Sequence, residues 1–190
     1  MRWPKLLAPV VMMACAGALA QTPGYQNVGR TPTQEEIRAW DISVGPAGKE
    51  LPPGSGSAKE GAALYTAKCA ACHGQNLEGN GLVNAPRLMG GQGTLTTLQM
   101  QRSIGSYWPF PTTVWDYISR AMPTTQRGSL KADEVYALTA FLLYKNDIIK
   151  ETDVMDAQSL PKVQMPNRNN FIPLSPEWKK DEKRPHGLYP

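Results

Sequence analysis

Two cysteines and a histidine form the most chemically informative stretch of the chain, Cys69-Ala70-Ala71-Cys72-His73. Two cysteines three residues apart, followed directly by a histidine, are the attachment signature of a c-type haem. Each thiol adds across one vinyl group of the porphyrin, and the adjacent imidazole can then ligate the iron. The motif therefore predicts one covalent haem c on Cys69 and Cys72, with His73 as the proximal iron ligand.

Other uses of these residues receive less support from the rest of the sequence. A structural zinc site requires four ligands, and the further candidates are Cys15, in an apolar leader, and His186, close to the C-terminus. A redox-active Cys-x-x-Cys belongs between a strand and a helix of a βαβ unit, and no strand-like run precedes Cys69. A disulfide between residues three apart is tight. Haem attachment is the preferred interpretation.

Residues 1–20 have the pattern of a signal peptide. Arg2 and Lys5 begin it, an apolar core follows, and Ala18-Leu19-Ala20 forms a small-x-small cleavage site. The apolar core is too short to predict a membrane anchor, so we expect a periplasmic protein without a membrane span after cleavage. The competing interpretation is a lipoprotein leader with Cys15 as the lipidated residue, although the residues before it match a lipobox poorly.

The charge balance does not predict a nucleic-acid partner. Cleavage of the leader lowers the 20 basic residues to 18, against 16 acidic ones, so that the formal net charge falls from +4 to +2. Two haem propionates would bring this value close to zero, and no dense cluster of Lys and Arg is present. A mature chain of about 170 residues suits one domain with extensions.

Residues 21–56 form an expected N-terminal arm with one short helix. Thr31 is the predicted N-cap of that helix, which runs to about Trp40. The Pro- and Gly-rich stretch 51–57 is expected to hold no regular element. Four apolar side chains argue that the arm wraps on the domain, because they need burial: Ile37, Trp40, Ile42 and Val44.

A helical haem domain is expected over 57–150. Its first helix starts at a capping box on Ser57 and leads into the haem motif. Gly61 and Tyr65 share one helix face, where the glycine would let another helix cross closely. A last helix over about 132–144, with an apolar stripe at helical spacing, is the expected crossing partner. The chain is thus predicted to be mainly α, with a single haem domain.

The passage between these helices is expected to surround the haem. A glycine-rich loop over 74–93 contains Pro86, whose carbonyl could accept a hydrogen bond from the proximal imidazole; an ordinary turn proline is the alternative. Short helices are predicted over 94–104 and 112–119. Five aromatic side chains are expected to line the haem pocket: Tyr107, Trp108, Phe110, Trp115 and Tyr117.

The sixth iron ligand is predicted to be Met122. It precedes a proline and a turn-rich stretch ahead of the last helix, and that proline would hold the backbone extended. Met89, Met100 and an open iron are the alternatives, whereas His186 lies in a charged tail. His/Met ligation raises the reduction potential and closes the iron to substrates. The predicted function is therefore electron transfer, and nothing in the sequence indicates a catalyst acting alone.

The order helix, Cys-x-x-Cys-His, loop, Met-Pro, helix resembles a class I c-type cytochrome domain over 57–146. Further blocks are similar to one family, the cytochrome subunit (SoxD-like) of sulfane and sulfite dehydrogenases. They are Trp40-Asp-Ile, Leu51-Pro-Pro-Gly-Ser-Gly, Gly105-Ser-Tyr-Trp-Pro, Thr113-Val-Trp-Asp-Tyr, Arg120-Ala-Met-Pro, Asp133-Glu-Val-Tyr-Ala-Leu-Thr-Ala and Met165-Pro-Asn-Arg. The resemblance implies that a molybdenum-cofactor subunit delivers electrons from a sulfur substrate to this haem, which passes them to a downstream redox protein.

The chain departs from that family in one respect. Some members carry two haem domains, whereas this chain has one Cys-x-x-Cys-His, which favours a separate soluble acceptor or a sulfite rather than a sulfane dehydrogenase partner. A free-standing soluble carrier, and a haem enzyme that releases Met122 to bind a sulfur compound, are the alternative functions. The Pro-rich tail, 151–190, is expected to pack along the haem domain or the partner as far as about Leu174, and to be loose beyond it.

Overall fold

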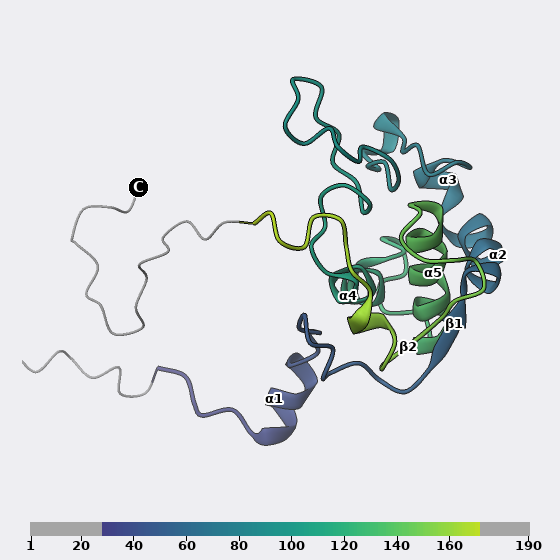
Figure 1. Cartoon of the computed structure of the whole chain (residues 1–190). Coiled ribbons are helices and arrows are strands. Elements are labelled where there is room, and N and C mark those ends of the chain that lie inside the picture. The colour runs from purple at the N-terminus through teal and green to yellow at the C-terminus, as the bar shows by residue number, and fades with distance from the viewer. Residues whose placement is uncertain (1–27, 172–190) are drawn as a thin grey trace, which may run out of the picture. The chain divides into compact units, whose positions relative to one another are not determined.

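The computed structural model describes residues 28–171, and the chain divides between Asp41 and Ile42 into two compact units. The first unit contains one helix, α1 (Gln34–Trp40) (Figure 1). The Thr33 hydroxyl accepts the N–H of Glu36, and the Glu36 carboxylate accepts the N–H of Thr33. The prediction of Thr31 as the N-cap is therefore wrong, because the reciprocal bonds of the capping box form two residues later.

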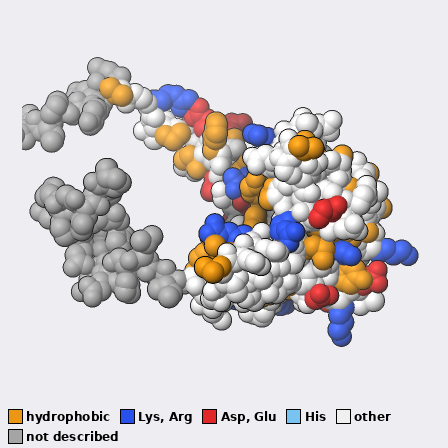
Figure 2. Space-filling view, turned by 90° about the horizontal axis from the view of Figure 1, so that it is seen from above, with side chains coloured by type: hydrophobic (Ala, Val, Ile, Leu, Met, Phe, Trp, Pro, Cys, Tyr) orange, Lys and Arg blue, Asp and Glu red, His pale blue; other side chains and the backbone are white. Residues whose placement is uncertain are grey.

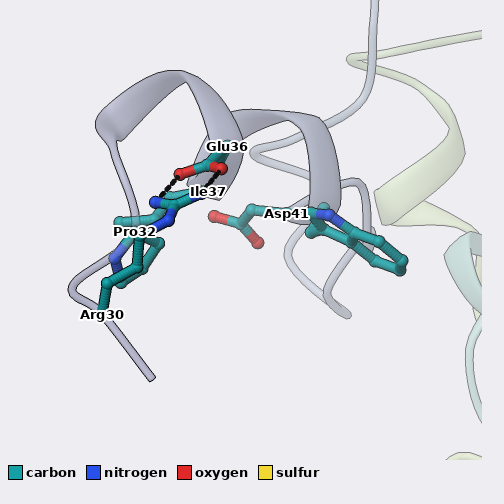
Figure 3. A pocket seen from close by; sticks show the side chains of 6 residues that line it. Arg30, Pro32, Glu36, Ile37 and Asp41 are labelled. Carbon is teal, nitrogen blue, oxygen red and sulfur yellow. Dashed lines mark hydrogen bonds and ion pairs between the residues drawn. The ribbon is translucent and has the colours of Figure 1, made fainter. Parts of the chain in front are cut away.

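Helix α1 buries none of its residues. The Arg30 guanidinium pairs with the Glu36 carboxylate, and a shallow pocket lies beside this pair (Figure 3). Its lining is Arg30, Pro32, Glu36, Ile37, Trp40 and Asp41. Ile42 of the second unit is 57% exposed, so its expected burial is wrong. Helix α1 by itself leaves Ile37 and Trp40 exposed, and their packing on the domain stays a prediction. Val44 is buried as predicted.

Three helices make up most of the second unit: α2 (Ala58–Lys68), α4 (Pro111–Ala121) and α5 (Ala132–Lys145). Shorter helical turns are α3 (Ala70–His73), η1 (Gly81–Val83) and η2 (Leu160–Lys162). Figure 1 shows α5 packed beside α2 and α4. The prediction of a mainly helical domain with flanking regions is confirmed.

The crossing of α2 and α5 is the structural centre of this unit. A Cβ placed on Gly61 would lie 2.0 Å from the carbonyl oxygen of Ala137, so the two backbones are in direct contact there. One turn further along α2, the Tyr65 ring packs on Phe141 with 5.2 Å between ring centroids. The predicted close crossing at Gly61 is confirmed, and it fixes the direction in which α2 delivers the haem motif.

Helix α4 is held in place by contacts with α5 and with the segment around Val44. Pro111 occupies its first turn, and Trp115 packs against Tyr136 of α5 with ring centroids 5.5 Å apart. The buried Asp116 carboxylate pairs with Arg120 and accepts the backbone N–H of Val44 at 3.0 Å. Residues from 42 onward, which the sequence assigned to the arm, are in this way bonded to the haem unit.

A two-stranded antiparallel sheet was not expected from the sequence. Strand β1 (Ser55–Ser57) pairs with β2 (Val154–Asp156), so the prediction that 51–57 holds no regular element is wrong. Gly56 makes this strand fit, because a Cβ there would lie 2.3 Å from the backbone nitrogen of Ala137. The predicted helix over 94–104 is also absent, and turns replace it.

The first part of the tail packs along the haem domain, as predicted. Met155, Leu160 and Met165 are each no more than 4% exposed and belong to the same apolar core as α5.

The predicted signal peptide and the tail beyond 171 lie outside the described residues. Between residues 28 and 171, no helix is long and apolar enough to cross a membrane. Basic and acidic side chains are interspersed on the face shown in Figure 2.

Candidate functional site

The two cysteines and the histidine lie in one helical turn. Cys69 ends α2, where its N–H donates to Tyr65, and its own carbonyl accepts from Cys72 at 3.1 Å and from His73 at 2.9 Å. Both thiols are free; Cys72 is exposed and Cys69 half-buried. One rigid turn therefore presents two thiols and an imidazole, as attachment of a porphyrin along one edge requires.

The thiol chemistry does not favour a dithiol redox pair. Burial raises the pKa of the Cys69 thiol to about 11, an effect that nearby Lys68 only partly offsets. Redox-active cysteines have a lowered pKa, because the thiolate is the nucleophile. Furthermore, β1 pairs antiparallel with β2, so the motif does not follow the parallel strand of a βαβ unit. Within residues 28–171, no cluster of three or more Cys, His, Asp or Glu side chains could hold a metal ion.

The orientation of His73 is set by a backbone carbonyl. Its Nδ1 lies 3.0 Å from the carbonyl oxygen of Pro86. Because that oxygen can only accept, Nδ1 must carry the proton, and Nε2 is left with the lone pair that an iron would bind. The predicted contact of Pro86 is confirmed. Such a bond fixes the ring plane and the tautomer of a ligating histidine.

The loop that carries Pro86 is tied down on both sides. Asn80 and Ala85 exchange backbone hydrogen bonds of 2.8 and 3.0 Å, and the N–H of Leu88 donates to Leu77 at 2.9 Å. The Asn146 side chain then donates to the Leu88 carbonyl at 3.0 Å.

The role of Asn146 was missed from the sequence. Its side chain also accepts the N–H of Gly90 at 3.1 Å, and its own carbonyl accepts from Gln92. It is 2% exposed and caps the C-terminal end of α5. An asparagine at the end of an apolar helix was the available signal, but its partners Leu88 and Gly90 are more than 50 residues away in the chain.

Tyr65 links α2 to the turn that follows the histidine. Its hydroxyl donates to the carbonyl of Gly74 at 2.7 Å, and burial raises the pKa of this phenol above its usual value. Gly74 has φ +82°, a left-handed conformation that favours glycine. The Tyr65 side chain therefore fixes the C-terminal end of α3.

Replacing Tyr65 with phenylalanine is expected to destabilise the protein by about 1–2 kcal/mol, because the Gly74 carbonyl loses its partner in a half-buried place. Denaturant unfolding of the haem-loaded protein measures this. Tyr117→Phe is the matched control: Tyr117 is 48% exposed, and its hydroxyl makes no hydrogen bond within the described part of the chain. Equal stability losses in the two variants would contradict the assignment.

Met122 caps the C-terminal end of α4. Its N–H donates to Ile118 at 3.1 Å, its backbone is extended, and its side chain is half-buried against the core that also contacts Cys69. Of the alternatives, Met100 is 45% exposed, whereas Met89 is also half-buried against the core. His186 lies outside the described residues. The structure thus places Cys69, Cys72 and His73 together and holds Met122 on a separate element of the same unit; the iron ligands stay a prediction.

The aromatic side chains have divided roles. Trp115 belongs to the interface between α4 and α5, so it is a core residue. Trp108 packs edge-on against Tyr117, with ring centroids 5.8 Å apart. Tyr107 and Phe110 contact the tail through Phe171 and Arg168. The aromatic segment before α4 is therefore where the tail packs onto the domain.

The residues present fit a covalent haem c. Two free thiols lie in one turn, the imidazole has its Nδ1 occupied and its Nε2 available, and a half-buried thioether ends α4. In a His/Met c-type site the two thiols attach the porphyrin, and an imidazole and a thioether are the iron ligands.

Comparison with known proteins agrees with this chemistry. The family model "Cytochrome c" matches residues 58–146. A chain of the crystal structure of the sulfane dehydrogenase SoxCD from Paracoccus pantotrophus is similar, with a TM-score of 0.70 and 42% sequence identity. The match covers 78% of this chain and 72% of that chain. No curated protein matched.

Proposed function

Because this chain belongs to the cytochrome c family and is a relative of the SoxD cytochrome subunit of SoxCD, we propose that it is a periplasmic monohaem electron carrier for a sulfur-oxidising dehydrogenase. It accepts electrons from a molybdenum-dependent sulfite or sulfane dehydrogenase subunit and passes them to a downstream redox protein. The observation that carries this proposal is the 42% identity over 78% of the chain, well beyond the 58–146 segment of the family model.

Membership of the family implies a covalently attached haem c. Cys69 and Cys72 would hold it, and His73 and Met122 would ligate the iron. When bound, the group supplies reversible one-electron chemistry. The protein's part is to fix the His73 ring through Pro86, to supply a soft thioether at the end of α4, and to keep both on packed helices.

Structured regions outside the haem domain support a dedicated partner. Residues 42–57 and 151–165 are packed into the same core through Val44, Leu51, Met155, Leu160 and Met165. A free carrier needs a haem domain alone, whereas these extensions give the chain additional ordered surface. Their presence favours a subunit of a complex over a free-standing carrier.

The test is a rapid-mixing experiment with the haem-loaded cytochrome, a molybdenum-dependent dehydrogenase subunit, and sulfite or a sulfane-sulfur compound as its substrate. We expect the haem to be reduced within the turnover time of the dehydrogenase, and the two proteins to co-elute in gel filtration. Two controls are the cytochrome with sulfite alone and the complex with a molybdenum-free subunit; both should leave the haem oxidised. An oxidised haem in the complete mixture would overturn the proposal, and reduction without co-elution would favour the free carrier.

A further inference from the structure

A half-buried arginine, Arg168, lies in the C-terminal extension, outside the segment that the family model matches. Nη1 of Arg168 is shielded from solvent and has no hydrogen-bond partner among residues 28–171. The other such side-chain atoms in that range are uncharged hydroxyl and indole groups, of Thr112, Trp115 and Thr139. The guanidinium nitrogen is thus the charged atom in this set. A charged donor without a hydrogen-bond partner costs more free energy than an uncharged one.

The position of Arg168 is fixed by its neighbours. Its guanidinium lies over the Phe110 ring, 5.2 Å from the centroid. The adjacent Asn167 side chain donates to the carbonyl of Tyr107 at 2.8 Å, and Met165, whose carbonyl accepts the N–H of Arg168, is 3% exposed. The guanidinium is therefore held against the segment that leads into α4.

A guanidinium stays protonated in proteins, so it cannot relieve burial by losing its charge. A charged nitrogen that is shielded from water is normally paired, yet no carboxylate within residues 28–171 forms an ion pair with Arg168. The cation–π contact with Phe110 supplies no hydrogen-bond acceptor to the shielded Nη1. An anion would be the best acceptor for this cationic donor.

A haem carries two propionate carboxylates, the anionic geometry that a guanidinium fork matches. We infer that Arg168 donates a hydrogen bond from its guanidinium to a haem propionate, so that the C-terminal extension forms part of the haem site. This inference rests on the proposed function, because it requires the haem.

Helix α4 connects the segment that contacts Arg168 with the predicted iron ligand Met122. It begins next to Phe110 and ends at Met122, and its 11 residues span about 16 Å. The guanidinium over Phe110 thus lies at the opposite end of α4 from Met122, as a donor to the propionates, the part of the haem remote from the iron, would require.

The decisive experiment compares two arginines in the haem-loaded protein. Arg168→Gln removes the half-buried charge. Arg102→Gln is the matched control, because Arg102 also lies over an aromatic ring, 5.1 Å from the Tyr107 centroid, but is exposed. Ferric haem carries one more positive charge than ferrous haem, so loss of a nearby cation favours the ferric form. We expect Arg168→Gln to shift the redox equilibrium by about three- to tenfold toward ferric, tenfold being about 59 mV. Arg102→Gln should shift it less than twofold, and Arg168→Lys should restore part of the difference.

A second measurement needs no variant. In the ferrous wild-type protein, NMR should show a nuclear Overhauser effect between the guanidinium protons of Arg168 and the methylene protons of one propionate. Its absence, or equal potential shifts in the two glutamine variants, would overturn the inference while leaving the haem and the proposed function intact. A chain that attaches no haem would overturn both.

Discussion

Replacing Met122 with alanine is expected to convert the haem from a six-coordinate low-spin to a high-spin state and to lower its reduction potential strongly. The thioether stabilises ferrous iron, and axial ligands move haem potentials over a range of about 0.8 V. Met122 is the C-cap of α4 and its side chain is half-buried. Another side chain could take its place only if the surrounding structure moved, which costs free energy. Optical titration and electron paramagnetic resonance of the ferric protein measure both effects.

Met100→Ala is the matched control for this substitution. Met100 is 45% exposed on a loop, and its loss should leave spin state and potential unchanged. Met89→Ala tests the remaining described alternative, because Met89 is half-buried against the same core. If the spectrum changes in Met89→Ala or Met100→Ala and survives in Met122→Ala, the assignment of the sixth ligand is wrong.

Replacing Gly61 with alanine is expected to destabilise the fold by about 2 kcal/mol or more. The new Cβ would lie 2.0 Å from the Ala137 carbonyl oxygen and 2.7 Å from the Cβ of Phe141, so α2 and α5 must separate. Overpacking of this kind costs about 3 kcal/mol, of which the better helix propensity of alanine recovers about 1 kcal/mol. Thermal and denaturant unfolding of the haem-loaded protein give the value.

Gly81→Ala provides the comparison for Gly61. A Cβ at Gly81 meets no atom within 4 Å, so its stability change should stay within about 0.5 kcal/mol. Gly61→Ala should also release the ring of Tyr65 from Phe141, which near-ultraviolet circular dichroism detects. A Gly61→Ala protein as stable as the Gly81→Ala protein would show that the crossing is looser than described.

Local chemistry made the haem motif predictable from the sequence. Cys69, Cys72 and His73 act within one helical turn, so their spacing alone specifies what they can bind together. Gly61 and Tyr65 were identified because helical periodicity puts them on one face, and Pro86 because a carbonyl partner for the imidazole was required. Each of these predictions depends on neighbours in the chain or on a single well-defined crossing.

Contacts between distant segments could not be predicted in the same way. Strand β1 forms because residues 154–156 pair with it. The residues next to Gly56 in the sequence predict a loop, so this strand could not be found from the local sequence. Asn146 and Asp116 act through backbone groups more than 50 residues away. The segment 94–104 lost its expected helix because Thr94 instead donates to the Gly91 carbonyl and accepts the N–H of Gln101. Side-chain bonds to the backbone outcompeted a short helix without a packing partner.

The most direct test of the account is the optical spectrum of the purified chain, ferric and ferrous, together with the mass of the peptide that contains Cys69 and Cys72. We predict a peptide heavier by one haem, a low-spin c-type spectrum, and the weak far-red band of methionine sulfur bound to ferric haem. A peptide without haem, or a high-spin ferric spectrum without that band, would contradict a closed His/Met electron carrier.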